Sequence, residues 1–156
     1  MEIKLVLYLP REAVSVPVTR QVLDGCLQTL GVTPDTRADI ALALGEACAN
    51  VIQHAGPGEE YEVQVSARNR RCTIEVVNSG SRDIEPVAVA DDPVPATAER
   101  GRGLKIIDAV VDNLQLTRND RRGTTTVHFE KTLELLPGAA GQQLLDADGV
   151  GRRQER

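Results

Sequence analysis

A stretch of thirteen residues, 40–52, carries a single charged side chain, Glu46, and this constrains the fold more than any other part of the sequence. Its apolar residues recur at helical spacing and Pro34 is a favoured first-turn residue, so we expect a helix from Pro34 to His54. A helix of this length with one face in water would carry several charges. More than one side of this helix is therefore expected to be covered.

Glu46 and Asn50 are expected on one side of this helix, because residues four apart lie one above the other. The opposite side is the expected core stripe: Ile40, Ala41, Leu44, Ala47, Cys48, Val51 and Ile52. A polar pair of this kind either points to water or is covered by a ligand or a lid. The small and apolar residues beside it favour a cover: Leu42, Ala43, Gly45 and Ala49. A covered carboxylate needs a polar partner.

The chain before this helix predicts one strand and one further helix. Residues 3–9 alternate apolar and polar side chains, which is typical of a strand, and Pro10 ends it. Between residues 16 and 30 the apolar side chains recur at helical spacing, and Gly31 follows as a stop. The expected buried stripe of that helix is Val18, Val22, Leu23, Cys26, Leu27 and Leu30.

The second half of the chain predicts two hairpins, separated by a long loop and a third helix. Residues 61–65 and 72–76 alternate and predict antiparallel strands that are joined near Asn69. A proline-rich loop over residues 80–100 precedes the third helix, which is expected to begin at Leu104. Two more strands are expected near residues 113–118 and 124–132. The simplest arrangement is an α+β two-layer sandwich, in which a mixed β-sheet carries three helices on one face.

Length and composition limit the organisation and the partners. The 156 residues suffice for one domain, which is expected at residues 1–136. The polar, glycine-rich segment 137–156 is expected to be a disordered tail. Aromatic residues make up 2% of the chain and the net charge is −5, which disfavours nucleic acid and anionic lipid as partners.

The sequence also predicts a cytoplasmic protein. Its apolar stretches all fall short of the roughly 18 residues that a membrane helix needs, and the N-terminal apolar run is too short for a signal peptide. Cys26, Cys48 and Cys72 are odd in number and far apart, so we expect three reduced cysteines in the core.

Glycine-containing segments supply the other candidate site residues. Residues 101–104, Gly-Arg-Gly-Leu, are expected to open directly into the third helix, so that backbone amides and the positive helix end meet at Gly103 as an anion site. Taken alone, this segment is more simply explained as a flexible joint. Asn78-Ser79-Gly80 and Gly123-Thr124-Thr125, taken alone, are turns.

Together these segments resemble the four ATP-binding boxes of the superfamily of gyrase, chaperone, histidine-kinase and MutL ATPases, over residues 3–132. The boxes correspond to Glu46 to His54, Val76 to Gly80, Gly101 to Leu104 and Gly123 to Thr125. The Glu-Ala-x-x-Asn helix and the Arg-Gly-Arg-Gly-Leu turn look most like the serine kinases that act as bacterial anti-sigma factors. The resemblance implies the histidine-kinase-like (Bergerat) ATPase fold.

The resemblance implies an ATP-dependent serine/threonine protein kinase, in which Asn50 holds Mg²⁺ and Glu46 is the base for the attacking serine hydroxyl. Nucleotide contacts are implied for Asn50, Asn78, Gly80, Arg100, Gly101, Arg102, Gly103, Leu104, Gly123, Thr124 and Thr125. The implied partners are an anti-anti-sigma (STAS-type) protein, which is phosphorylated, and a sigma factor, which is sequestered when that protein is absent. Transcription would then be regulated by partner switching. Members of this family often dimerise, so a homodimer is one state to test.

Two departures from the family pattern leave a second interpretation open. The position that usually carries Asp, which accepts a hydrogen bond from the adenine amino group, is Asn78, so this contact lacks charge assistance. The second glycine of the same box is replaced by Arg82. The alternative is a non-catalytic module of the same fold that binds a protein partner with weak or no ATP turnover. An accessory ATPase domain without a protein target is a third interpretation.

Overall fold

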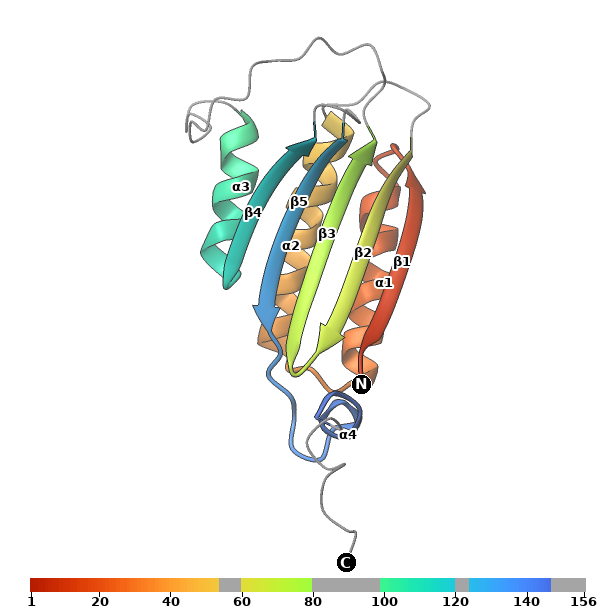
Figure 1. Cartoon of the computed structure of the whole chain (residues 1–156), viewed down its shortest axis with the longest axis vertical. Coiled ribbons are helices and arrows are strands. Elements are labelled where there is room, and N and C mark those ends of the chain that lie inside the picture. Colours follow the sequence, from red (N-terminus) through yellow and green to blue (C-terminus); the bar gives the residue numbers. More distant parts are fainter. Residues whose placement is uncertain (54–59, 80–98, 120–123, 147–156) are drawn as a thin grey trace, which may run out of the picture.

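The computed structural model describes residues 1–53, 60–79, 99–119 and 124–146, which form one sheet and four helices (Figure 1). The elements are β1 (Ile3–Pro10), α1 (Ser15–Thr29), α2 (Pro34–Gln53), β2 (Glu60–Arg68), β3 (Arg71–Ser79), α3 (Glu99–Val110), β4 (Asn113–Asn119), β5 (Thr124–Thr132) and α4 (Ala140–Leu145). Helices α1 and α2 lie across one face of the sheet, α3 lies beside β4 and packs on α2, and α4 lies at one end. The expected α+β two-layer sandwich is confirmed.

The sheet has the strand order β1-β2-β3-β5-β4, and each neighbouring pair is antiparallel. We expected a mixed sheet, and this detail differs. Two helices, α1 and α2, connect β1 to β2 and return the chain to the end at which β1 finishes, so that β2 runs in the opposite direction. Asn69 and Arg70 form the β2–β3 turn with positive φ values of 49° and 59°, as a tight two-residue hairpin turn requires.

The core lies between the sheet and the helices and is mainly aliphatic. Its largest fully buried side chains include Tyr61, Phe129, Ile40, Leu44, Ile74 and Ile107. The strands contribute alternate residues to it, as the burial pattern of β2 shows, because successive side chains of a strand point to opposite faces. The composition, with few aromatic residues, is thus sufficient for one continuous core.

Helix α1 buries a different stripe from the one that we predicted. Leu23 and Leu27 are buried as expected, but Val18 and Val22 are 48% and 39% exposed. Ser15 and Thr19 take the buried positions instead. The Thr19 hydroxyl donates to the Ser15 carbonyl (2.8 Å), and the Ser15 hydroxyl lies 2.6 Å from the Tyr61 hydroxyl. These hydrogen bonds make the buried hydroxyls tolerable, which hydrophobic spacing could not indicate.

The three cysteines are free thiols, but only two of them lie in the core. Cys48 and Cys72 are buried, and burial raises the pKa of each thiol to about 12. Such thiols are neutral and unreactive at physiological pH. Cys26 is exposed on α1, so the prediction of a core position was wrong for this residue.

The segment after β5 is ordered as far as Asp146, whereas we predicted disorder from residue 137 onward. The Gly141 amide donates to the Leu30 carbonyl (2.9 Å), and Leu145 is fully buried. A β-carbon at Gly141 would lie only 2.5 Å from the Leu30 oxygen, so glycine is what permits this close packing. Arg70 Nε adds a hydrogen bond to Asp146 Oδ1 at 3.0 Å. Residues 147–156 lie outside the described part of the chain.

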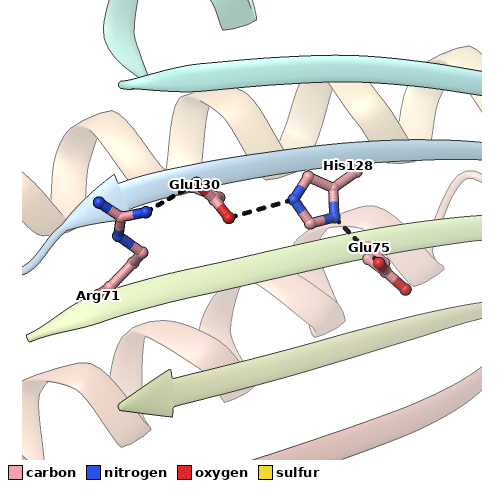
Figure 2. Close-up of polar contacts among 4 residues, drawn as sticks. All are labelled: Arg71, Glu75, His128 and Glu130. Carbon is pink, nitrogen blue, oxygen red and sulfur yellow. Dashed lines mark hydrogen bonds and ion pairs between the residues drawn. The ribbon is translucent and has the colours of Figure 1, made fainter. Parts of the chain in front are cut away.

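The face of the sheet that points away from α1 and α2 is mostly polar, although β1 exposes Val6 and Tyr8 there. Figure 2 shows a chain of contacts along it, from Glu75 to His128 Nδ1 (2.9 Å), from His128 Nε2 to Glu130 (3.4 Å), and from Glu130 to Arg71 (3.3 Å). Glu75 and His128 are direct partners in the register of β3 and β5, so this chain ties the two strands together. It lies on the opposite side of the sheet from α2 and Glu46.

None of the helices within the described ranges has the length and apolar character that crossing a membrane would require.

Candidate functional site

Helix α2 carries Glu46 and Asn50 between its neighbours α1 and α3. Both residues are half-buried, so the expected cover is present at this pair, but Leu42, which we also expected to be covered, is 44% exposed. The predicted core stripe is confirmed at Ile40, Leu44, Ala47, Cys48 and Val51. Ala43 is also fully buried, while Ala41 and Ile52 are only half-buried. The buried stripe is therefore rotated from our prediction, toward the side that holds Ala43.

Glu46 lies directly against the backbone of α3 at Gly103. A β-carbon added to Gly103 would be 3.2 Å from Glu46 Oε2 and 3.9 Å from Glu46 Cβ. Few real β-carbons make so close a contact, so any side chain here would displace the carboxylate. Glu46 of the helix box and Gly103 of the second glycine box, more than fifty residues apart in the sequence, thus meet at this point.

The predicted role of Gly103 at a helix start is wrong. Helix α3 begins at Glu99, so Gly103 is its fifth residue, and its N–H can bond to the first residue's carbonyl. The amides without a partner inside the helix belong to residues 99–102. Glycine is a poor helix former, and the sequence alone favoured a loop here. Packing against α2 outweighs that preference.

Of the other residues in this glycine box, Arg102 is exposed and Leu104 is half-buried against the core. Gly101 and Arg100 lie in the first turn of α3, and the side chain of Arg100 lies outside the described part. An anion near this turn would meet backbone amides and the positive end of the helix. The backbone amides that the predicted anion site would need therefore lie one turn nearer the N-terminus of α3 than we expected.

Asn78 lies on β3 and faces the helices, opposite Tyr61 on β2 and Thr125 on β5. Its Oδ1 atom is buried and has no hydrogen-bond partner among the described residues. Tyr61 cannot supply one, because its hydroxyl is paired with Ser15, which already donates to the Glu12 carbonyl (2.7 Å). Burial raises the pKa of Tyr61 to about 12, so this hydroxyl stays neutral.

An unpartnered buried acceptor such as Asn78 Oδ1 costs roughly 1–3 kcal/mol. A ligand with an N–H donor at this point would recover that free energy. The exocyclic amino group of adenine is such a donor, and the residues present therefore fit an adenine nucleotide.

Four predicted segments lie at the same end of the sheet in Figure 1: the C-terminal half of α2, the end of β3, the start of β5 and the start of α3. Thr124 and Thr125 begin β5 and are half-buried, opposite Ser79 and Asn78. Gly80, Gly123, Arg82 and His54 lie outside the described residues. The structure therefore gathers the described candidates in one region.

Arg20 is a neighbour of the site that the sequence analysis did not identify. A β-carbon at Gly45 would lie 3.3 Å from Arg20 Cδ, so the side chain crosses from α1 onto α2 next to Glu46. The signal available in the sequence was Gly45, a helix-interior glycine, which often marks a close approach of a neighbouring group.

The oxygen atoms of Glu46 and Asn50 suit a hard cation. Mg²⁺ prefers carboxylate and amide oxygens, takes few ligands from the protein, and completes its shell with water and phosphate. Within the described residues there is no group of three or more His, Cys, Asp or Glu side chains that could hold a metal by themselves. This donor set therefore fits Mg²⁺ bound together with a phosphate-bearing ligand better than a closed structural metal site.

Residues 9–130 match the family model for the histidine kinase-like ATPase domain. The chain belongs to this family. The match spans α2, β3 and α3, which carry Glu46, Asn50, Asn78 and Gly103.

Several curated relatives share the sequence over most of their length. The serine-protein kinases RsbW of Bacillus thuringiensis (strain Al Hakam) and of Bacillus cereus (strain 03BB102) are each 26% identical, over 75% of this chain and 79% of the relative. The serine-protein kinase RsbW of Bacillus mycoides (strain KBAB4) is 25% identical over the same shares.

A solved structure shows the same fold. The crystal structure of the RsbU and RsbW domains of Rv1364c from Mycobacterium tuberculosis superposes with a TM-score of 0.65 at 18% identity. It covers 84% of this chain, which spans 32% of the length of that one.

Proposed function

We propose that this chain is an ATP-dependent serine/threonine protein kinase of the anti-sigma type. It phosphorylates a serine of an anti-anti-sigma (STAS-type) protein and binds a sigma factor when that protein is absent. The observation that carries this proposal is the contact between Glu46 and Gly103, which joins the carboxylate of the helix box to the glycine box on α3. The name of the relatives, serine-protein kinase, supports serine as the acceptor.

In this proposal Glu46 is the general base. Its carboxylate accepts the proton of the serine hydroxyl as the serine oxygen forms a bond to the γ-phosphorus of ATP. The bond between that phosphorus and the bridging oxygen to the β-phosphate breaks, and ADP leaves. Gly103 presents no side chain that would push the carboxylate away from the acceptor.

The remaining residues bind and orient the nucleotide. The Asn50 amide oxygen holds Mg²⁺, which neutralises charge on the phosphates when it is bound. Asn78 Oδ1, buried and unpartnered in the described chain, accepts a hydrogen bond from the adenine amino group. The amides of the first turn of α3 face the phosphates, with Arg100 and Arg102 as sources of positive charge.

Asn78 also favours a second candidate function, a non-catalytic module that binds a protein partner. An amide oxygen is a weaker acceptor than a carboxylate, so adenine is held without charge assistance. In that case the fold and the Glu46–Gly103 contact serve partner binding alone.

Calorimetric titration with Mg-ATP, followed by phosphotransfer from γ-labelled ATP to an anti-anti-sigma protein, tests the proposal. The kinase predicts saturable binding that requires Mg²⁺, and label on a serine of the partner. Binding of the partner without nucleotide binding or transfer would favour the non-catalytic module. A chain that binds neither nucleotide nor partner would refute both.

A further inference from the structure

Lys131 is a charged residue at a core-facing position of β5. Along this strand Val127 and Phe129 face the helices and are buried, and Lys131 continues their alternation. Its partner in the register on β3 is the buried residue Cys72. The Lys131 side chain is only 19% exposed. An ammonium group at such a position is costly unless it is paired, so its partners carry information about its role.

The partners of Lys131 belong to two helices. Its Nζ donates to the Val110 carbonyl at 2.7 Å and lies 3.1 Å from Asp39 Oδ2. Val110 is the last residue of α3, where carbonyl groups lack partners within the helix and a positive charge is favoured. Asp39 lies near the start of α2. Lys131 therefore links α2, α3 and the sheet at one point.

A second set of hydrogen bonds fixes the chain just after α3. The Asp112 amide donates to the Glu130 carbonyl at 2.9 Å, and the Thr132 amide donates to Asp112 Oδ2 at 2.6 Å. These contacts involve the residues on either side of Lys131. The C-terminal end of α3 is thus attached to a short segment of β5.

The two helices meet again at Glu46 and Gly103, at the same distance along each helix from the Lys131 link. Asp39 and Glu46 are seven residues apart on α2, and Gly103 and Val110 are seven residues apart on α3. Seven residues are about 10 Å of helix and close to two full turns, so each pair lies on one side of its helix. The helices run in opposite directions, with the Lys131 link at one end of this interval and the Glu46–Gly103 contact at the other.

From this geometry we propose that Lys131 is a positioning residue, which sets the register of α3 along α2 and so seats Gly103 against Glu46. A slip of one residue would move α3 by about 1.5 Å and turn its contacting face by about 100°. Gly103 would then be replaced at Glu46 by a residue with a side chain. The inference rests on the proposed nucleotide-dependent function, because the seated contact matters there for nucleotide and phosphoryl transfer.

Lys131→Met removes the ammonium group and keeps most of the apolar stem. We expect Mg-ATP affinity to fall by about fivefold to tenfold, the size typical of a lost network contact. Lys131→Arg retains a donor and a charge, and restores most of the affinity. Lys4→Met is the matched control, because the Lys4 side chain is 68% exposed on β1, at the far edge of the sheet. The Mg-ATP affinity of this variant is expected to equal that of the wild type. Wild-type affinity in Lys131→Met would overturn the inference.

A double-mutant cycle separates positioning from general destabilisation. Lys131→Met removes the link to Val110, and Gly103→Ala alters the contact with Glu46, about 10 Å away along α3, so independent effects on the single-turnover transfer rate would multiply. If Lys131 acts through the contact between Gly103 and Glu46, the transfer rate of the double variant falls clearly less than the product of the single losses. A purely multiplicative result would overturn the inference.

Hydrogen exchange provides a readout without nucleotide. The Val111 amide donates to the Ile107 carbonyl at 3.1 Å, and we expect it to exchange faster in Lys131→Met relative to the amides of β2. Equal acceleration of exchange throughout the chain would show that Lys131 is merely structural.

If Lys131→Met fails to fold, Asp39→Asn is used instead, because it weakens one end of the link. The Val111 amide is then expected to exchange faster by a smaller factor. If the wild type binds no Mg-ATP, the proposed function fails, and hydrogen exchange still decides whether Lys131 holds α3.

Discussion

Glu46 on α2 rests against the backbone of Gly103 on α3, so closely that a β-carbon on Gly103 would come within 3.2 Å of the carboxylate oxygen Oε2. This contact makes the absence of a side chain at residue 103 a condition for the position of the carboxylate. A substitution of Gly103 can therefore change the geometry of the site while it leaves the stability of the helix intact.

Gly103→Ala is expected to impair phosphotransfer without loss of stability. Alanine is a better helix former than glycine by about 1 kcal/mol, and the atom that it meets belongs to the end of a side chain that can rotate away. Thermal melting should therefore stay near or above the wild-type temperature, while transfer to the partner falls. Transfer at the wild-type rate would show that the position of the Glu46 carboxylate is unimportant.

Asn78→Asp is expected to strengthen ATP binding by about 1 kcal/mol, which is several-fold in affinity, because a carboxylate is the stronger acceptor. The free protein should melt at a lower temperature, since the carboxylate is buried without a partner among the described residues. Asn78→Leu is the control in the opposite direction. The free protein should keep its melting temperature, and ATP binding should be lost. Unchanged ATP affinity in both variants, measured by calorimetry, would exclude Asn78 as the adenine contact.

Leu145 and Leu144 offer a matched pair for the C-terminal segment. Leu145 is fully buried, and Leu145→Ala is expected to cost about 2–4 kcal/mol of unfolding free energy. Leu144 is 37% exposed, and Leu144→Ala should cost much less, within about 1 kcal/mol. Urea denaturation of both variants measures the difference. Equal and small losses would mean that α4 does not dock on the domain in solution.

Asp112 predicts an acid-dependent contribution to stability. The hydrogen bond from the Thr132 amide lowers the pKa of this carboxyl below its ordinary value of 3.8. The folded state therefore binds fewer protons, and the contribution is full above pH 4 and is lost as the pH falls through the lowered pKa. Asp112→Asn should have a lower free energy of unfolding than the wild type at pH 7, and the difference between the two proteins should narrow below pH 4. A gap that is constant with pH would contradict this assignment.

Local patterns were sufficient to predict the order and type of most elements. Alternation placed the strands, and the near absence of charge from residues 40–52 indicated a helix covered on several sides. The half-buried positions of Glu46 and Asn50 agree with this. These features depend on neighbours in the sequence, and so they were accessible without a structure.

The features that were missed depend on contacts between distant segments. We expected no helix at Gly103 and no order at Gly141, because glycine disfavours both. Each of these glycines instead lies where another segment of the chain approaches closely. The sequence analysis did not identify Lys131, because its two helical partners, Val110 and Asp39, lie more than twenty residues away in the sequence. The unpartnered oxygen of Asn78 follows from the register of the sheet, which alternation alone does not fix.

Phosphotransfer by Glu46→Gln tests the central claim most directly, because the change keeps the shape of the side chain and removes the base. We expect Mg-ATP binding by calorimetry to remain near the wild-type value, while single-turnover transfer to the serine of the partner falls by at least about 100-fold, the lower range for loss of a general base. Transfer at the wild-type rate, with the same nucleotide affinity, would contradict the assignment of Glu46 as the base.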